Sequence, residues 1–350
     1  MSTTNYNFNY WAKLEPMKYF DKKREDLSDN LKKKYDAMIE NENNEYIATC
    51  KYDGEWTMFI KWDGQILIRS RSISKVTGAY GDKTAHLPHL VEEMTLWPDN
   101  TVILGEVCWG DFGSVSTDVG TILRCLPAKA VERQKERKLV VKVFDCLAIF
   151  GDSLLNIPYA DRVAQAHNMI SLTNINGNGY FTMTNICTSD KTPAEFADEI
   201  ISQGGEGVVI QRKDYIYEPG KRTAWKTLKL KQRLPQMELP VVGLLLPKRL
   251  YEGDCPETWP YSETDELGNI WLVTKPHYYG WMNGIIVELE DGTTCEVTSG
   301  LTDADREWLA TQEAAESIAQ GDLYAVIQAM QINTLGRLRH PALVRLRNDM

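Results

Sequence analysis

A single lysine stands at a position where chain geometry could make it reactive. Lys51 belongs to the stretch Lys51-Tyr-Asp-Gly54, between runs typical of strands at 45–50 and 56–62. The Asp53-Gly54 pair is a turn signal, so Lys51 lies at the mouth of a predicted hairpin and can face a pocket. A lysine that is desolvated beside other cations loses its proton more easily and becomes a nucleophile.

Later strands carry charges that such a lysine would need as neighbours. Each of these charges interrupts or ends an apolar run: Glu106, Asp145, Glu206, Lys229 and Lys231. Lys229 and Lys231 alternate with leucines, so both lie on one face of their predicted strand. Burying an unpaired charge is costly, and any one of these residues alone could simply be a satisfied charge at a strand end. As a set, they suit chemistry on a charged substrate.

Short strands and a few helices must position these side chains. We expect residues 1–45 to be helical, polar and mobile, with Ser28 or Asn30 as a helix cap. The periodicity then predicts strands and helices in alternation up to residue 231. The predicted strands are 45–50, 56–62, 65–70, 101–108, 139–147, 208–212 and 224–231, and the predicted helices are 86–94, 128–137, 160–170 and 193–203.

A domain boundary is expected near 232–239, which gives domains at 1–235 and 236–350. The second domain shows several short strands and one helix, at about 302–320, in little over a hundred residues. This pattern suits a small five-stranded barrel of the OB type. The aromatic and acidic segment 251–283 is expected to form an elaborated loop between two barrel strands.

The composition sets wider limits on function. The chain has 350 residues with 43% hydrophobic and 25% charged residues, the profile of a globular protein with two domains. No apolar run approaches the length of a membrane span, and seven cysteines without a CxxC pair argue for a reducing compartment and against a zinc site. The net charge of −10 counts against a nucleic-acid partner, although clustering of cations matters more than their sum.

Taken together and in order, the motifs resemble those of the covalent nucleotidyltransferase superfamily of ATP-dependent DNA ligases, RNA ligases and mRNA capping enzymes. The resemblance covers roughly residues 45–350 and is strongest to the small bacteriophage ATP-dependent DNA ligases, which lack a large N-terminal DNA-binding domain. Its motifs are Lys51-Tyr-Asp-Gly54, Ser70-Arg71-Ser72, Leu104-Gly105-Glu106, Val143-Phe144-Asp145, Glu206-Gly-Val-Val-Ile210, Leu228-Lys229-Leu230-Lys231, Gly300-Leu-Thr-Asp303 and the tail 336–349.

The resemblance implies an α+β fold: a nucleotidyltransferase (ATP-grasp-like) domain of antiparallel sheets and helices, followed by a β-barrel OB-fold domain. It implies that Lys51 attacks the α-phosphorus of ATP to form lysyl-AMP, that AMP passes to a 5′-phosphate, and that a 3′-hydroxyl then seals the nick. Such transfers depend on positioning and on neutralising charge.

The resemblance also assigns roles to individual residues. Asp53 shares the catalytic motif of Lys51, Lys229 and Lys231 hold the α-phosphate and help to depress the pKa of Lys51, and Phe144 stacks on adenine or only packs in the core. The residues implied to bind AMP are Thr49, Cys50, Lys51, Arg71, Glu106, Phe144, Lys229 and Lys231. Glu106 and Glu206 are implied to bind Mg²⁺. Arg345, Arg347 and Asp349 are implied to orient pyrophosphate.

The chain departs from the family pattern at three positions. Trp56 stands where most DNA ligases have an arginine for the nick phosphate, a role that Lys61, Arg69 or Arg71 could take over. Thr49 stands where many have a glutamate that accepts from the adenine amino group. Lys226 is a rival to Lys229, because the local spacing admits a shifted alignment.

The sequence therefore favours an ATP-dependent DNA ligase that uses ATP and Mg²⁺ on nicked double-stranded DNA. An RNA ligase, a capping guanylyltransferase with the same lysine chemistry and a non-catalytic nucleic-acid clamp are the alternatives; the tail and the Gly300-Leu-Thr-Asp303 turn favour DNA ligase. We expect a monomer in the cytoplasm, or in the host cytoplasm if the protein is viral, without membrane association.

Overall fold

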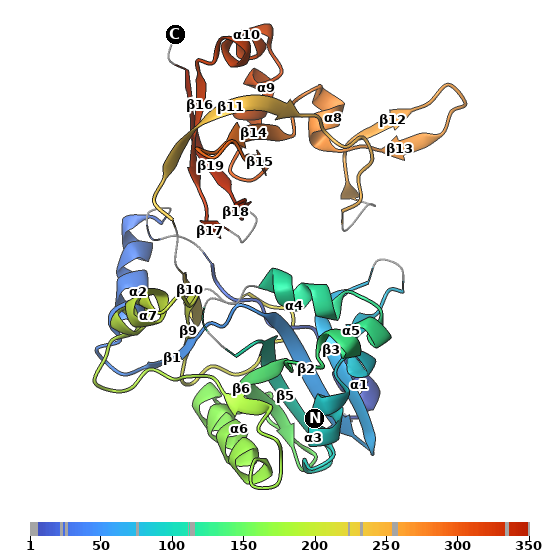
Figure 1. Cartoon of the computed structure of the whole chain (residues 1–350), viewed down its shortest axis with the longest axis vertical. Helices are drawn as coiled ribbons and strands as arrows, with labels where there is room; N and C mark the ends of the chain where they lie inside the picture. The colour runs from blue at the N-terminus through green and yellow to red at the C-terminus, as the bar shows by residue number, and fades with distance from the viewer. Residues whose placement is uncertain are drawn as a thin grey trace. The chain divides into compact units, whose positions relative to one another are not determined.

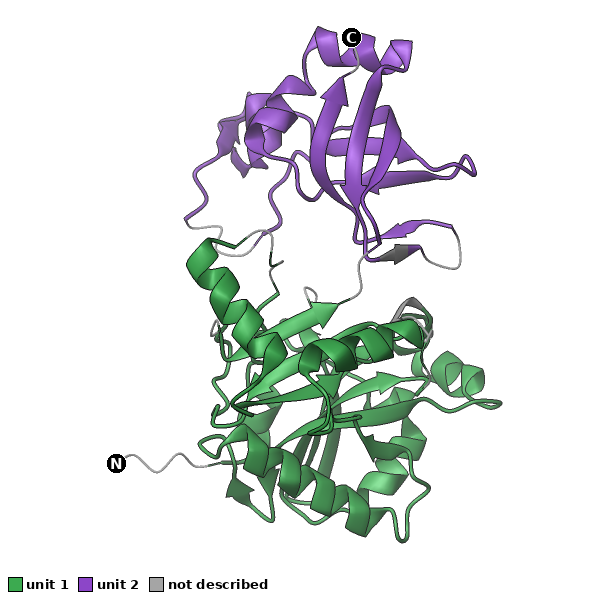
Figure 2. Cartoon of the chain, turned by 90° about the vertical axis from the view of Figure 1, so that its left-hand side faces the viewer, with its two compact units in different colours: residues 1–231 green, residues 232–350 purple. Residues whose placement is uncertain are grey.

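The computed structural model divides into two compact units, residues 1–231 and 232–350 (Figure 2). It describes residues 6–21, 24, 27–74, 77–110, 112, 116–222, 225–231, 234–253, 258–332 and 336–348. Asp349 and the first residue of the strand expected at 224–231 lie outside the described residues. The fold class expected from the sequence, an α+β nucleotidyltransferase domain followed by an OB-type barrel, is confirmed by the architecture of the two units.

The larger sheet of the first unit has the strand order β4-β3-β2-β5-β6-β7, with β8 parallel to β6. Its strands are β2 (Glu55–Trp62), β3 (Gln65–Ile73), β4 (Tyr80–Asp82), β5 (Thr101–Cys108), β6 (Val140–Ile149), β7 (Asp152–Ser153) and β8 (Phe181–Met183). Both faces of the central strands are covered, because successive side chains of a strand point to opposite faces. On β2, Phe59 packs into one core cluster, whereas Met58 and Ile60 pack into another.

Short helices and one long helix cover this sheet (Figure 1). They are α1 (Phe8–Lys13), the 3₁₀ turn η1 (Thr84–His86), α3 (Pro88–Met94), α4 (Ser116–Leu123), α5 (Pro127–Arg133) and α6 (Tyr159–Thr173). The helix expected at 128–137 therefore ends four residues early. The chain turns at Gln134, whose buried amide donates to the carbonyls of His86 and Ala130. Helix α4 was not predicted from the sequence.

The smaller sheet positions the nucleophile motif. Strands β1 (Tyr46–Cys50), β9 (Gly207–Arg212) and β10 (Thr227–Lys231) pair antiparallel in the order β1-β9-β10. Helices α2 (Asp29–Glu40) and α7 (Pro193–Ser202) cover one face, where Ala48, Val208 and Ile210 are buried. Thr192 and Glu195 form a capping box that starts α7. The alternate residues of β1, β9 and β10 are left to face the other side.

The N-terminal segment differs from the sequence-based expectation. Among the described residues before 45, only α1 and α2 are helical; residues 14–20 form no helix, and Trp11, Met17, Tyr19 and Phe20 are buried. The backbone N–H of Met17 donates to the hydroxyl of Tyr217, from the other end of the unit's sequence. The prediction of a polar, mobile segment was wrong because aromatic side chains without periodicity find partners that are distant in sequence.

The second unit is built on a five-stranded antiparallel sheet of order β15-β14-β11-β16-β19 that curls into the expected barrel type (Figure 1). Its strands are β11 (Met237–Leu245), β14 (Gly284–Glu288), β15 (Thr294–Val297), β16 (Leu323–Gln328) and β19 (Ala342–Asn348), with a small pair β17 (Gln331–Ile332) and β18 (Leu338–Arg339). The single helix expected at 302–320 is two helices, α9 (Asp303–Trp308) and α10 (Gln312–Gln320). Thr302 and Thr311 each cap a separate N-terminus.

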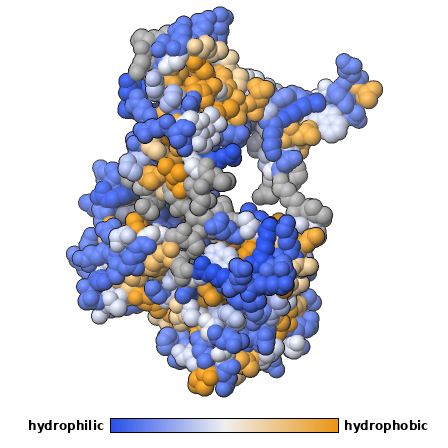
Figure 3. Space-filling view, viewed as in Figure 1, coloured by the Kyte–Doolittle hydropathy of each residue, from blue (hydrophilic) through white to orange (hydrophobic). Residues whose placement is uncertain are grey.

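The segment expected to be a loop at 251–283 contains structure of its own. It forms the hairpin β12 (Ser262–Thr264) and β13 (Ile270–Leu272) and the short helix α8 (Lys275–Tyr279). Tyr251 and Trp259 stack at 3.8 Å between ring centroids at its base. In Figure 3 the arm that carries β12 and β13 combines hydrophobic with hydrophilic residues.

A fully buried ion pair anchors α6 to the large sheet. Arg162 Nε and Nη2 donate to the two carboxylate oxygens of Asp145 at 2.8 and 2.9 Å, and both side chains are about 0% exposed. Arg162 also donates to the carbonyls of Ile157 and Tyr215. Asp145, which the sequence marked only as a charge within an apolar strand, is therefore a satisfied structural residue next to Phe144.

We predict that Arg162→Met lowers the free energy of unfolding by about 3–5 kcal/mol, because it leaves the buried Asp145 carboxylate without its cation. Urea denaturation followed by circular dichroism measures this loss. The matched control is Arg24→Met, which removes the partly exposed pair with Asp36 and should change the free energy by less than about 1 kcal/mol. Equal effects of the two substitutions would contradict a structural role for the buried pair.

Candidate active site

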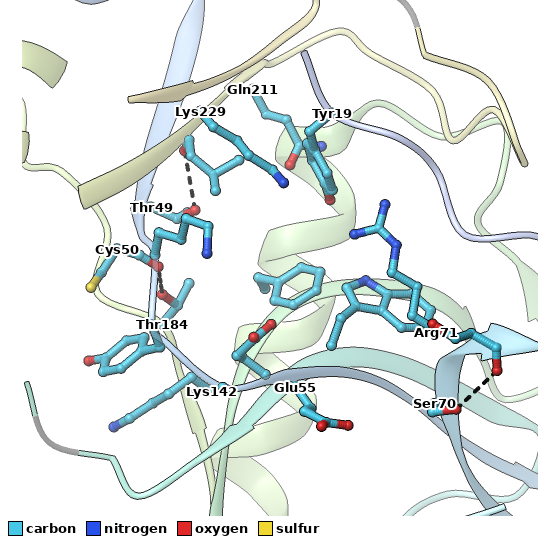
Figure 4. A pocket seen from close by; sticks show the side chains of 18 of the residues that line it. Tyr19, Thr49, Cys50, Glu55, Ser70, Arg71, Lys142, Thr184, Gln211 and Lys229 are labelled. Carbon is cyan, nitrogen blue, oxygen red and sulfur yellow. Dashed lines mark hydrogen bonds between the residues drawn. The ribbon is translucent and has the colours of Figure 1, made fainter. Parts of the chain in front are cut away.

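A cavity of about 510 Å³ lies in the first unit, lined by residues from both of its sheets (Figure 4). This volume lies within the range of small-molecule and cofactor sites. Of the residues proposed from the sequence, those that line it are Thr49, Cys50, Lys51, Arg71, Glu106, Phe144 and Lys229. They come from five different strands or strand ends, so the tertiary structure gathers residues that lie up to 180 positions apart in the sequence.

Lys51 follows β1 directly, and its backbone N–H donates to the carbonyl of Gly207 at 2.8 Å. Its ammonium forms an ion pair with the carboxylate of Glu206. Burial alone lowers the pKa of Lys51, but the charges of Glu206, Glu106 and Asp53 outweigh burial and raise the pKa above its ordinary value. The expected depression of the Lys51 pKa is therefore wrong for the protein without ligand, because carboxylates rather than lysines dominate its surroundings.

Glu106 ends its motif on β5, and its charge acts on the same lysine. Burial raises the pKa of Glu106 to about 7; the charge of Lys51 lowers it, whereas those of Glu206 and Asp53 raise it further. A crowded, poorly solvated carboxylate of this kind gains from an added cation. Together with Glu206 it offers the hard oxygen donors that Mg²⁺ prefers.

The described residues contain no cluster of three or more His, Cys, Asp or Glu side chains that could enclose a metal ion by themselves. Two carboxylates fit Mg²⁺ nonetheless, because this ion keeps several waters and is bound through one or two carboxylates plus substrate phosphates. Glu106 lines the cavity, and Glu206 lies beside it in contact with Lys51.

Cations also line the cavity, among them Arg71 and Lys229 (Figure 4). Burial, followed by repulsion from Lys51 and Lys231, lowers the pKa of Lys229 to about 8. Lys231 does not line the cavity and instead pairs with Asp21 at 2.8 Å. The rival Lys226 lies 4.8 Å from the ring centre of Tyr215 and is not a lining residue, so Lys229 is the lysine that the cavity contains.

The departures from the family pattern have clear positions. Trp56 lines the cavity where an arginine was expected. Of its three candidate replacements, Lys61 donates to the backbone carbonyls of Thr95 and Trp97, and Arg69 is 1% exposed and donates to the carbonyl of Leu14. Neither lines the cavity, whereas Arg71 does.

Sequence reasoning missed several residues of the cavity wall. They are Tyr19, Glu55, Lys83, Arg124, Lys142, Thr184 and Gln211. Tyr52, Ser70, Ser72 and Val209 also line the cavity and were named only as members of motifs, without a role of their own. Side chains two residues apart lie on the same face of a strand, so the position of Val209 on β9 could have indicated Gln211. No local signal pointed to Thr184 or Tyr19, which reach the cavity only through the fold.

Arg345 and Arg347 lie in the second unit, on strand β19. Arg347 forms an ion pair with Glu238 of β11 at 2.7 Å, and Arg345 is exposed. Their expected role toward pyrophosphate stays a prediction.

The residues of the first unit carry a family signature that agrees with this geometry. Positions 26–231 match the family described as ATP dependent DNA ligase domain. The chain belongs to this family. The match takes in both sheets of the first unit and every cavity residue except Tyr19.

Curated relatives in archaea bear the name DNA ligase. A protein of Haloferax volcanii is 32% identical over 187 residues, which are 52% of this chain and 29% of that protein. A protein of Thermococcus fumicolans is 26% identical over 221 residues, which are 62% of this chain and 37% of that protein. The chain thus spans about a third of the length of these curated relatives.

Solved structures share the fold of the whole chain. A chain from a structure–function analysis of Lig E DNA ligases aligns with a TM-score of 0.60 and 18% identity, covering 95% of this chain and 98% of that one. A second, named Pmar-Lig_PreS3, gives a TM-score of 0.59 and 18% identity, covering 90% and 65%. In the part of the chain that the structure describes, no helix combines the length and the apolar character needed to cross a membrane.

We predict that Glu206→Gln lowers the pKa of Lys51, because the substitution removes the largest favourable charge and leaves burial in place. Burial lowers the pKa of Lys51 and the Glu206 charge raises it. Without that charge, the neutral amine of Lys51 therefore becomes populated at a lower pH. Labelling with an amine-reactive acylating reagent across a pH series, read by peptide mass spectrometry, should then modify Lys51 at lower pH than in the unmodified protein.

Lys191 serves as an internal control in the same digest, because it is exposed, pairs with Glu199 and does not line the cavity. Its labelling profile should not change. A Lys51 profile that also stays unchanged would mean that Glu206 does not hold the amine in its charged form.

Proposed function

We propose that this protein is an ATP-dependent DNA ligase that seals nicks in duplex DNA through a lysyl-AMP intermediate. The observation that carries the proposal is Lys51 at a nucleotide-sized cavity, in an ion pair with Glu206 and beside Glu106, in a chain of the ATP-dependent DNA ligase domain family. A lysine so placed has the geometry of an activated nucleophile with a base in contact.

In the first step, the Lys51 amine attacks the α-phosphorus of ATP. A nitrogen–phosphorus bond forms, the bond to the pyrophosphate oxygen breaks, and pyrophosphate leaves. Because the amine must first lose a proton, the Glu206 carboxylate that accepts its hydrogen bond is the group able to take it. AMP then passes to the 5′-phosphate at a nick, and the 3′-hydroxyl displaces AMP to join the strand.

Glu106 and Glu206 would hold Mg²⁺, which neutralises phosphate charge and withdraws electrons from phosphorus when bound. Engaging Glu206 in this way weakens its hold on the Lys51 ammonium, so metal and nucleophile are coupled through one carboxylate. Lys229 and Arg71, which both line the cavity, would bind the α-phosphate. Lys83 and Arg124, also in the wall, are candidates for the nick phosphate that Trp56 cannot bind.

We predict that Lys51→Ala abolishes the acid-sensitive protein–AMP adduct formed from α-labelled ATP and Mg²⁺. The adduct is measured by denaturing electrophoresis after incubation with label. Omission of Mg²⁺ should also prevent its formation in the unmodified protein. A normal adduct in Lys51→Ala would place the nucleophile elsewhere, and no adduct in the unmodified protein would refute the ligase proposal.

The same preparation separates the alternative substrates. We expect label transfer from ATP but not GTP, and sealing of nicked DNA in preference to RNA ends. Transfer from GTP would favour a capping guanylyltransferase, and a preference for RNA ends would favour an RNA ligase.

The second unit is tested by Arg345→Ala rather than by deleting the tail. Strand β19 pairs with β16 along its length and buries Leu343, so deletion would disrupt the barrel itself. Arg345 is exposed, so its substitution spares the barrel. We predict that Arg345→Ala slows adenylylation at least about tenfold, which is the order of magnitude expected when one phosphate contact is lost. Sealing of nicks that already carry AMP should be unchanged. Equal loss of both steps would contradict a role confined to the pyrophosphate leaving group.

A further inference from the structure

One side-chain amide in the cavity wall has a buried N–H donor group without a hydrogen-bond acceptor. Gln211 is 1% exposed, lines the cavity, and its Nε2 has no hydrogen-bond partner among the residues that the structure describes. A buried donor left unpaired is costly, and each such group in a folded protein calls for a physical reason. In Figure 4 its side chain lies beside Tyr19 at the edge of the cavity.

The position of Gln211 along β9 sets which part of a nucleotide it would meet. Gly207, Val209 and Gln211 share one face of β9, and their partners on β10 are Lys231, Lys229 and Thr227. Lys51 contacts Gly207 through its backbone at the start of this row. Because two residues of a strand span roughly 7 Å, Gln211 lies roughly 13 Å along the strand from the nucleophile end. The phosphate end of a nucleotide belongs at Lys51, so its base belongs toward Gln211.

Thr49 supplies a complementary group from the neighbouring strand. It pairs with Val209 across the β1–β9 ladder, and its hydroxyl donates to the Val209 carbonyl at 3.3 Å. The Thr49 hydroxyl also interacts with the hydroxyl of Tyr159. These two oxygens compete for its only hydrogen, so toward the cavity the Thr49 oxygen can act only as an acceptor. Gln211 is its diagonal neighbour in the ladder, at a spacing that lets one small group contact both side chains.

We propose that Gln211 and Thr49 read the nucleobase and select adenine, in place of the glutamate that this chain lacks. The inference rests on the proposed use of ATP. The Gln211 amide donates through Nε2 to a ring nitrogen of adenine and accepts from the exocyclic amino group through Oε1, the bidentate pairing that glutamine makes with adenine. The second amino hydrogen goes to the Thr49 oxygen. Guanine presents an oxygen at this position, which faces an acceptor at Thr49 and is rejected.

The same unit contains a matched control. Gln134 is also 1% exposed, but its Nε2 donates to the carbonyls of His86 and Ala130 at 2.9 and 3.0 Å, and its Oε1 accepts from the backbone N–H of Leu139 at 3.4 Å. It does not line the cavity. Replacing each glutamine by leucine in turn therefore distinguishes an amide that binds a ligand from an amide that stabilises the fold.

The test measures binding to the full chain by titration calorimetry, with AMP, GMP and purine riboside 5′-monophosphate, which lacks the exocyclic amino group. We expect the unmodified protein to prefer AMP over the other two by about tenfold to a hundredfold, the range for a bidentate base contact. Gln211→Leu should lower this preference by about tenfold or more, and Thr49→Val should lower it in the same direction. Gln134→Leu should leave the preference unchanged.

Thermal unfolding of the same variants supplies a second readout. Gln211→Leu should unfold at the same or a higher temperature, because it removes an unpaired buried donor, whereas Gln134→Leu should unfold at a lower temperature. An unchanged AMP preference in Gln211→Leu overturns the inference, and so does an unmodified protein that binds AMP and GMP equally or binds neither. Adduct formation from ATP with unchanged base preference would refute the base-reading role and leave the ligase proposal standing.

Discussion

The ion pair between Lys51 and Glu206 is the interaction on which the cavity depends. It places a basic nitrogen next to a carboxylate in a poorly solvated site, where each charge stabilises the other and neither is easily removed. The pair holds the lysine in its charged form, as the raised pKa of Lys51 indicates. In the proposed reaction, Lys51 is thereby kept unreactive until a ligand or cation competes for Glu206, which makes its reactivity conditional on what enters the cavity.

Lys51 and Glu206 lie at the ends of two paired strands of the small sheet, β1 and β9, and the cavity beside them forms because the two sheets are held against each other. The hydroxyl of Thr184 donates to the carbonyl of Cys50 on β1, and the backbone N–H of Thr184 donates to the carbonyl of Val143 on β6. The backbone of Lys51 is bonded to Gly207. The two Thr184 bonds join the small sheet, which carries Lys51 and Lys229, to the large sheet, which carries Glu106 and Phe144, whereas the Lys51 bond fixes the nucleophile motif within the small sheet. The cavity is the space between two rigid surfaces rather than a loop-built pocket, which limits the movement of every reacting group.

Buried polar groups in this protein divide into those that serve the fold and those that face the cavity. The Asp145–Arg162 pair and the Gln134 amide have hydrogen bonds that account for their burial. The polar groups of the cavity wall lack such compensation. Gln211 has an unpaired N–H donor, and the pKa values of Glu106 and Lys229 are shifted so that their neutral forms are favoured. Such shifts are concentrated at functional sites, where the unfavourable burial of a polar or charged group is offset when a ligand binds.

The sequence by itself determined the chemistry-bearing residues and much of the fold. The apolar strands, the turn after Lys51 and the period of the Leu-Lys-Leu-Lys run are local signals, so Lys51, the carboxylates of Glu106 and Glu206, and Lys229 could be named before the fold was known. The tertiary structure alone decided how these residues act. It showed that Lys51 has carboxylates as its dominant neighbours, that Asp145 is structural, and that Lys226, Lys61 and Arg69 are engaged outside the cavity. It also brought Tyr19, Thr184 and Gln211 into the wall. The physical reason is the distance along the sequence over which each signal acts. Periodicity and turn chemistry depend on a few neighbouring residues, whereas pKa values, burial and hydrogen-bond partners depend on groups that only folding brings together.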